Sequence, residues 1–350
     1  MGGMIDVPAP SAAVPWYRSP LPPGEMKKLH RRSDLLGFLQ AGGYLAVLAA
    51  TGTASWLAAY AWRWPWWAVA LLVFLHGTGG SFLINAVHEL THGTVFQTKA
   101  LNAFFARLFS FLGWINFEMF ETSHARHHRY TLHPPDDLEV VLPIRIVATQ
   151  FFLGGIVNPR WFFKWGLDNI VRIALGRFQG EWELMLHPAD KPETRRGPVR
   201  WARLLLLGHG LVLAFSVWRG LWLLPVLVSL MPCYGGWLFF LCNNTQHIGL
   251  QDNVSDFRLC CRTFTVNPVV RFLYWHMNYH IEHHMYAAVP CYRLGRLHRL
   301  IRHDLPPTPR GIAATWREIA MIQEQQEADP SYQHQPPLPV PSLSELMVRA

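Results

Sequence analysis

Charged residues are scarce in this chain of 350 residues. Asp, Glu, Lys and Arg make up 15% of it, whereas 51% is hydrophobic. Soluble domains carry about 25% charged residues, so this balance favours a membrane protein over a soluble enzyme. The formal net charge of +8 fits the excess of Lys and Arg on the cytoplasmic side of membrane proteins. The sequence has no basic run with interleaved aromatic residues, so we expect no nucleic-acid partner.

The sequence also lacks a cysteine framework. Its five cysteines form no CxxC pair and no regular spacing, which argues against disulfide staples and against a cysteine-bound cluster. We interpret them as reduced thiols, which indicates that the catalytic part faces a cytosol. The N-terminus has no apolar stretch of the kind that a signal peptide needs. The cysteines are Cys233, Cys242, Cys260, Cys261 and Cys291.

Long apolar runs, by contrast, are prominent. A run of about 20 apolar residues can cross the hydrocarbon core of a bilayer, which is about 30 Å thick. Two short turns, rich in Trp, group the runs into pairs. The sequence therefore predicts an all-α integral membrane protein with four transmembrane helices in two hairpins. The predicted spans are about 35–62, 67–87, 204–217 and 221–241.

This topology places most of the polar chain on one side of the membrane. Two hairpins leave the N-terminus, residues 88–200 and the C-terminal segment together, and that side carries nearly all of the Lys and Arg. The bias predicts that this side is cytoplasmic. We expect residues 102–116 and 149–165 to form helices in or near the interface, below a helical cytoplasmic cap.

The two ends of the chain differ from the middle in composition. Residues 1–33 are polar and Pro-rich, and we interpret them as a mobile arm with a basic end. Residues 34–310 form the predicted membrane domain. Residues 311–350 form a Pro-rich tail that we expect to be partly disordered, with one helix near 313–327.

The first histidine pattern lies at the end of the second predicted span. His88 and His92 are four residues apart, a spacing that puts both side chains on one helical face. With Glu89 between them, the pentad also matches HExxH, the zinc metalloprotease motif. In that alternative, Glu89 is the general base and a third ligand comes from elsewhere.

Two further patterns share the spacing HxxHH. They comprise His124, His127 and His128, and then His280, His283 and His284. With His88, His92 and a lone His247, the chain offers nine imidazoles on one predicted membrane side. This number exceeds the coordination sphere of one metal and suits two. Imidazole binds Fe, Zn, Cu and Ni, so the ligand type alone leaves the metal open.

His247 is preceded by Asn243 at helical spacing. A buried amide beside a ligating histidine can hold a metal-bound water, so we predict that role for Asn243. His133, His276, His298 and Asp137 lie near the clusters and are candidates for outer contacts. The remaining histidines have no supporting spacing, and we expect them to be structural or solvent-facing. They are His30, His76, His187, His209, His303 and His334.

These motifs resemble the integral-membrane fatty acid desaturase family, whose three histidine boxes are HxxxH, HxxHH and HxxHH. The boxes here are 88–92, 124–128 and 280–284, and the run 278–286 is close to bacterial members. The family's additional ligand matches His247, and its water-holding Asn matches Asn243. The resemblance extends over roughly residues 35–300.

The resemblance implies a di-iron centre held by these nine histidines, with O2 as co-substrate and electrons from an external donor. The chain shows no fused cytochrome b5 domain, so the implied partners are a separate ferredoxin, rubredoxin or cytochrome b5 with its reductase. Fatty-acyl desaturation is the leading interpretation. Hydroxylation or another oxygenation of a lipid, terpenoid or small alkyl or methoxy compound stays open. A metalloprotease or a metal transporter is a more distant alternative, and the spans offer a transporter only His76 and His209.

Overall fold

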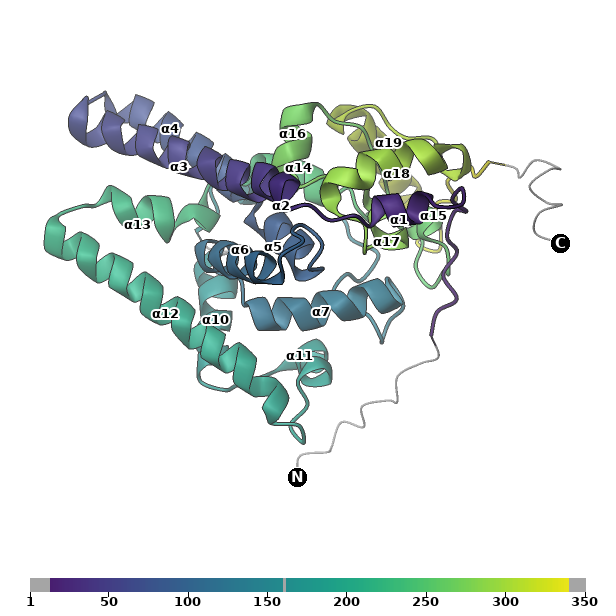
Figure 1. Ribbon diagram of the computed structural model, residues 1–350, viewed down its shortest axis with the longest axis horizontal. Helices are drawn as coiled ribbons and strands as arrows, with labels where there is room; N and C mark the ends of the chain where they lie inside the picture. The colour runs from purple at the N-terminus through teal and green to yellow at the C-terminus, as the bar shows by residue number, and fades with distance from the viewer. Residues whose placement is uncertain (1–12, 160–161, 340–350) are drawn as a thin grey trace.

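The computed structural model describes residues 13–159 and 162–339, and the described chain is helical (Figure 1). It contains no β-strand in these residues, where β pairing is limited to isolated bridges such as Tyr17 with Asp256. The predicted all-α class is therefore confirmed. Three helices are long and apolar enough to cross a membrane, or up to four if a bent pair of helices counts as one span.

The first hairpin matches its prediction closely. One continuous helical segment, Asp34–Ala61, spans 28 residues. It consists of α2 (Asp34–Gly37), α3 (Gly43–Trp56) and two π-helical stretches, η1 (Phe38–Gly42) and η2 (Leu57–Ala61). Ser33 caps its start by accepting a hydrogen bond from the Leu36 amide at 3.4 Å.

The return helix of this hairpin is longer than predicted. After the turn at Pro65, α4 (Trp66–Gly80) and α5 (Leu83–Thr91) form a segment of 26 residues. The helix therefore ends at Thr91, four residues after the predicted end at residue 87. The first histidine pattern therefore lies at the end of this helix, with His88 on its last turn and His92 directly after it.

A sharply bent helix pair follows. Helices α6 (Lys99–Leu112) and α7 (Phe117–Tyr130) meet at 110° across a four-residue break. Trp114 in this break has a left-handed backbone with φ of 55°. The side chain of Asn116 caps α7 by accepting a hydrogen bond from the Met119 amide at 3.3 Å. The bend directs α7, with the second histidine pattern, across the inner end of α5 (Figure 1).

Short helices connect α7 to the next long helix. The predicted helix at 149–165 is not continuous, because Val157 has an extended backbone and pairs with Tyr234 in an isolated bridge. Residues 160 and 161 lie outside the described chain. The connecting elements are α8 (Ala148–Gln150), η3 (Phe151–Ile156), η4 (Phe162–Leu167), α10 (Asp168–Ala174) and α11 (Gly180–Leu186).

The third long helix begins earlier than predicted. Helix α12 (Glu193–Arg219) has 27 residues, so the basic segment that precedes the predicted start at residue 204 is the first part of this helix. The helix ends at Gly220, whose φ of 65° is the left-handed conformation that glycine adopts most easily. The predicted break at 218–220 is therefore shifted to residues 220–222, between the end of α12 and the start of the next helix at Leu223.

The fourth predicted span, 221–241, is wrong as a single helix. It divides into α13 (Leu223–Val228), the 3-10 turn η5 (Met231–Cys233) and α14 (Trp237–Asn243). Pro232 and the pair Gly235–Gly236 interrupt helical hydrogen bonding here. The loop at 156–158 supplies partners instead, because the Gly235 amide donates to Ile156 O at 2.8 Å and the Asn158 amide donates to Cys233 O at 2.7 Å. Irregular backbone of this kind is tolerated at membrane depth when protein surrounds it.

Small residues on α4 let this broken segment pack closely. A Cβ atom on Gly77 would lie 2.2 Å from the Tyr234 ring, and one on Gly80 would lie 2.0 Å from Met231 Sδ. Glycine therefore sets the distance between α4 and the interrupted segment, as small residues do between membrane helices.

The C-terminal part is a cap of short helices. The expected helix near 313–327 is confirmed as α19 (Ile312–Ala328). Residues 340–350 lie outside the described chain. The other elements of the cap are α15 (Phe257–Cys260), α16 (Pro268–Leu273), α17 (His280–Met285), α18 (Cys291–Ile301) and η6 (Arg302–Asp304).

The predicted mobile arm packs against this cap over most of its described part. Helix α1 (Glu25–Leu29) lies beside α18, and Leu29 and Ser19 are fully buried. Trp16 stacks on Phe257 with ring centroids 4.0 Å apart. Sequence composition missed these contacts because they join segments more than 200 residues apart. Residues 1–12 lie outside the described chain.

Two arms of long helices diverge from the cap (Figure 1). One arm is α3 with α4, and the other is α12 with α13. Both arms expose large apolar side chains such as Leu71 and Leu211, and both carry exposed tryptophans at their far ends, including Trp66 and Trp218. Exposed apolar helices that end in an aromatic belt fit a lipid environment.

Gly235 provides a test of this packing. Gly235→Ala should lower the unfolding midpoint much more than Gly220→Ala, because both glycines have positive φ but only Gly235 lacks space for a Cβ atom. That atom would lie 2.4 Å from the Thr78 amide nitrogen, whereas nothing lies within 4 Å at Gly220. We expect about 1–2 kcal/mol of backbone strain at both sites, with a clash added at Gly235. Thermal unfolding in detergent measures this, and equal midpoints for the two variants would contradict the packing.

Candidate metal centre

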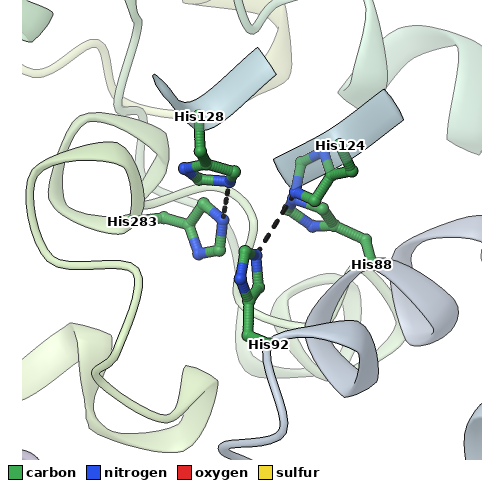
Figure 2. A group of neighbouring side chains, drawn as sticks. All are labelled: His88, His92, His124, His128 and His283. Atoms are coloured by element: carbon green, nitrogen blue, oxygen red, sulfur yellow. Dashed lines mark hydrogen bonds between the residues drawn. The ribbon is translucent and has the colours of Figure 1, made fainter. Parts of the chain in front are cut away.

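Two groups of metal-ligating side chains lie at the junction of α5, α7 and the cap. The first, called here the five-histidine group, points into one shared space (Figure 2). The second, called here the cap group, contains three histidines and a cysteine. In each group the possible ligand atoms all lie within 4.8 Å of one another. The five-histidine group is His88, His92, His124, His128 and His283, and the cap group is His247, Cys261, His280 and His284.

Three elements build the five-histidine group. Helix α5 carries His88, and His92 directly follows the end of that helix. Helix α7 carries His124 and His128, and α17 carries His283. Their Nε2 atoms converge. His124 Nε2 lies 3.3 Å from His92 Nε2, and His283 Nε2 lies 3.1 Å from His128 Nε2 (Figure 2).

Helix α17 divides its histidines between the two groups. His280 and His284 are one turn apart and face the cap group, whereas His283 faces the five-histidine group. His280 Nε2 lies 2.9 Å from His247 Nε2 and 3.1 Å from His284 Nε2. The HxxHH spacing therefore places one short helix between two sites.

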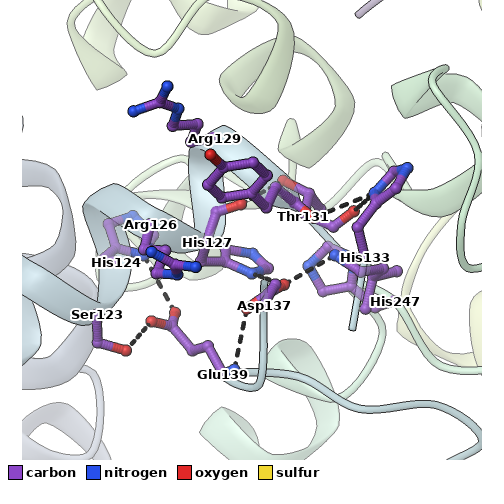
Figure 3. Close-up of polar contacts among 12 residues, drawn as sticks. Ser123, His124, Arg126, His127, Arg129, Thr131, His133, Asp137, Glu139 and His247 are labelled. Carbon is purple, nitrogen blue, oxygen red and sulfur yellow. Dashed lines mark hydrogen bonds and ion pairs between the residues drawn. The ribbon is translucent and has the colours of Figure 1, made fainter. Parts of the chain in front are cut away.

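His127 is the one predicted histidine outside both groups. Its ring centroid lies 5.0 Å from that of His284 and 5.4 Å from that of His247, so it borders the cap group. Its Nδ1 atom lies 2.8 Å from Asp137 Oδ2 (Figure 3). The structure thus assembles eight of the nine predicted histidines into the two groups and leaves His127 adjacent to them.

Acceptors behind the rings fix several of the histidines. His124 Nδ1 lies 3.2 Å from Glu139 Oε1 (Figure 3), and His247 Nδ1 donates to the Cys260 carbonyl at 2.8 Å. A proton held on Nδ1 leaves the Nε2 lone pair free to bind a metal, and such outer contacts orient ligating histidines. The predicted outer role of Asp137 has the same geometry at His127.

Asp137 is itself held firmly. It accepts hydrogen bonds from the amides of Leu132 at 2.8 Å and Glu139 at 2.9 Å. Burial alone would raise the pKa of Asp137, but the hydrogen bonds from His127 and these amides lower it overall. The group is therefore a carboxylate at neutral pH and can accept the His127 proton.

Glu89 lies on the outer side of the five-histidine group. Its side chain is fully buried, with Oε1 3.0 Å from His283 Nδ1 and 3.7 Å from His88 Nδ1. Within the described chain, neither oxygen of Glu89 accepts a hydrogen bond of good geometry. A protease base must face the metal-bound water, whereas Glu89 lies behind a histidine whose Nε2 faces the group.

Two buried histidines of the centre, His247 and His283, are neutral at pH 7. Burial lowers the pKa of both His247 and His283 to about 3. Neutral imidazole is the form that binds a metal. Burial therefore disfavours the protonated, positively charged form of these two rings.

The arrangement fits bound metal ions on two observations. Several Nε2 atoms face one another at 2.9–3.3 Å, and acceptors lie against Nδ1 of His124 and His247, so a cation between the facing nitrogens would bind their lone pairs. The two oxygens of the buried Glu89 carboxyl group accept no hydrogen bond from the described residues, and a nearby cation would stabilise the charged form of this group. Nitrogen donors of this kind suit iron as well as zinc, copper or nickel.

Two details at the cap group differ from the sequence interpretation. Helix α14 ends at Asn243, so His247 lies beyond it and the two residues do not share a helical face. Asn243 Oδ1 accepts a hydrogen bond from Asn85 Nδ2 at 3.3 Å. The role of Asn243 toward a metal-bound water stays a prediction.

Cys261 is the residue that the sequence did not reveal. It belongs to the cap group, and it is fully buried, with Sγ 3.9 Å from Cys260 Sγ. Scattered cysteines give no spacing signal, so nothing in the sequence distinguished it from the other four. Its thiol is a candidate ligand beside three histidines.

Other histidines have structural partners, as expected. His76 Nε2 lies 3.0 Å from Leu227 O, and His209 Nε2 lies 3.0 Å from Phe111 O. These bonds explain both mid-span histidines without a transport path. His298, a candidate for an outer contact, pairs with Glu282 and so links α18 to α17.

The fold and the site together define a helical membrane protein with a two-part histidine centre. The family model for fatty acid desaturases matches residues 64–316, a region that contains all nine predicted histidines. Because this region is well over half of the chain, the protein belongs to the fatty acid desaturase family, and the resemblance drawn from the histidine boxes is confirmed. Membership implies an oxidoreductase. No curated protein matches the chain.

A substitution of Glu139 tests whether the acceptors on Nδ1 hold the histidines in place for metal binding. Glu139→Ala should make bound metal easier to remove, by about 10–100-fold in affinity, because His124 loses the acceptor that orients it. Competition with a chelator, followed by metal analysis, measures this. Asp136→Ala is the matched control, since Asp136 lies in the same loop but pairs with Arg126 at 2.6 Å. Equal metal loss in both variants would contradict the assigned role.

Proposed function

We propose that this chain is an O2-dependent di-iron oxidase of the membrane and that it introduces a C=C bond into a fatty-acyl chain. The observation that carries the proposal is the division of one helix, α17, between two adjacent groups of buried histidines. Eight histidines in two groups, with His127 beside them, suit two metal ions and exceed the needs of one.

The residues divide between two irons in this proposal. The five-histidine group would hold one iron. His247, His280 and His284 would hold the other, with His127, Cys261 and Asn243 as nearby groups. When bound, the iron pair supplies the oxidising power to remove hydrogen from an unactivated C–H bond, using O2 and two external electrons.

The chain's own contribution is positioning and protection. Asp137 and Glu139 hold protons on Nδ1 of their histidines, which keeps the opposite nitrogens directed inward. Burial excludes water from most of the rings, since His280, His283 and His284 are at most 3% exposed. Both effects keep the ligands neutral and in place.

The membrane arrangement supports an apolar substrate. We propose that the long helices cross the bilayer as two hairpins, with residues 221–243 returning as an interrupted segment. The N-terminal strap (residues 16–29), the histidine centre and the cap then share the cytoplasmic side. A lipid substrate reaches such a site from the bilayer, and an electron carrier reaches it from the cytosol.

The electron donor is proposed to be a separate protein of the ferredoxin, rubredoxin or cytochrome b5 type, with its reductase. All five cysteines are buried free thiols and do not form a four-cysteine cluster site. Exposed Arg196 and Arg200 on α12 provide positive charge for an acidic carrier.

Product analysis tests the proposal. Mass spectrometry of cells that express the chain should show a lipid that has lost two hydrogen atoms. A lipid, terpenoid or small alkyl or methoxy compound that gains one oxygen atom instead would replace desaturation with oxygenation on the same residues.

The metal content is tested separately. The purified protein should contain about two iron equivalents per chain, as the two groups require. His284→Ala should lose metal and activity together, while His303→Ala, outside both groups, should keep both. Full activity in His284→Ala, or one metal in the intact protein, would overturn the proposal.

A further inference from the structure

A cavity of about 340 Å³ lies directly against both histidine groups. Its lining includes His128 from the five-histidine group and His284 from the cap group. A molecule in this cavity therefore contacts ligands of both proposed irons. The rest of the lining is Arg18, Met26, His30, Met285, Tyr286, Ala287 and Ala288.

The cavity has a buried end and an exposed end. His284 and Met285 are buried, at 3% and 0% exposure, and form its deep end. Arg18 and His30 are exposed and mark the outer end. Met26, Met285 and Ala287 contribute apolar wall between these two ends. The shape fits a molecule whose apolar part reaches the centre and whose polar group stays outside.

The outer end is cationic. Arg18 has no ion pair or hydrogen bond with any of the described residues, and no Asp or Glu belongs to the cavity lining. A guanidinium binds carboxylate or phosphate through two parallel hydrogen bonds. The free charge therefore favours an anionic group at the outer end over a neutral or cationic one.

The N-terminal strap, residues 16–29, fixes Arg18 in this place. Tyr17 OH donates to Asp304 Oδ2 at 2.7 Å, and the Ser19 carbonyl accepts from Tyr286 OH at 2.5 Å. Arg18 lies between these two anchored residues, so its backbone is held although its side chain is exposed. A pre-positioned arginine binds an anion at lower entropic cost than a mobile one.

We propose that this cavity admits the substrate to the histidine centre and that Arg18 binds an anionic group of that substrate, a carboxylate or a phosphate. The inference rests on the proposed function and names its substrate class as an amphiphilic organic anion. The volume is near the lower end of small-molecule sites, so it fits a compact substrate or the anionic end of a longer one.

Binding of octanoate tests the inference without turnover. The full chain, loaded with iron and kept free of O2 and reductant, is placed in bilayer discs of a zwitterionic lipid. Saturation-transfer NMR then measures the affinities of octanoate and of uncharged 1-octanol. Arg18→Gln should weaken octanoate binding about tenfold, because a charge-assisted hydrogen bond is lost, and should leave 1-octanol unchanged.

Two further variants separate the cavity from general surface charge. Lys27→Gln removes one positive charge from the same strap outside the cavity lining, and it should bind octanoate like the native chain. Ala288→Phe adds a bulky ring at the exposed end of the cavity and should weaken binding of both ligands. Iron content, measured on every variant, should be unchanged in Arg18→Gln.

The source of the anion is distinguished by the lipid. Displacement of octanoate by discs that contain phosphatidic acid supports a lipid headgroup, and failure to displace it supports a soluble anion at the same site. Unchanged octanoate binding in Arg18→Gln or in Ala288→Phe would overturn the inference. Because no turnover is measured, Arg18-dependent binding by a chain that oxidises nothing would contradict the proposed function alone.

Discussion

Imidazole nitrogens that face one another in a buried space constrain the whole molecule. The Nε2 atom of His280 lies 2.9 Å from that of His247 and 3.1 Å from that of His284. The five-histidine group has a similar arrangement. Lone pairs this close repel unless a cation lies between them. Elements distant in the chain must therefore meet at one point and stay there. The bend between α6 and α7, the end of α5 and the short α17 all serve this meeting.

The outer contacts explain how the fold keeps such a centre intact. Carboxylates behind the rings fix the tautomer, and two of them, Asp137 and Glu139, come from one loop after α7. Glu89 shows that a familiar motif changes meaning with its surroundings. Its Oε1 atom lies 3.0 Å from His283 Nδ1, so in the proposed centre the HExxH pentad would supply two ligands and an outer carboxyl group. The long helices contribute little to these contacts, and their exposed apolar faces suit a lipid environment.

The sequence predicted the parts of this structure that depend on local spacing. Histidines at i, i+3 and i+4 identified α17 and α7, and apolar runs identified the three long helices. The errors arose where tertiary contacts decide. Pro232 and Gly235 interrupt the fourth run, and the packing of Tyr234 against Gly77 that compensates for the break is invisible in one dimension. Cys261 and the N-terminal strap were missed for the same reason, because their partners lie far away in the chain.

The central claim is that two metal ions lie between these histidines. Anomalous diffraction at the iron absorption edge, from crystals of the iron-loaded protein, tests it most directly. The account predicts two peaks, one among the Nε2 atoms of the five-histidine group and one beside His247, His280 and His284. A single peak, or peaks away from these nitrogens, would contradict it.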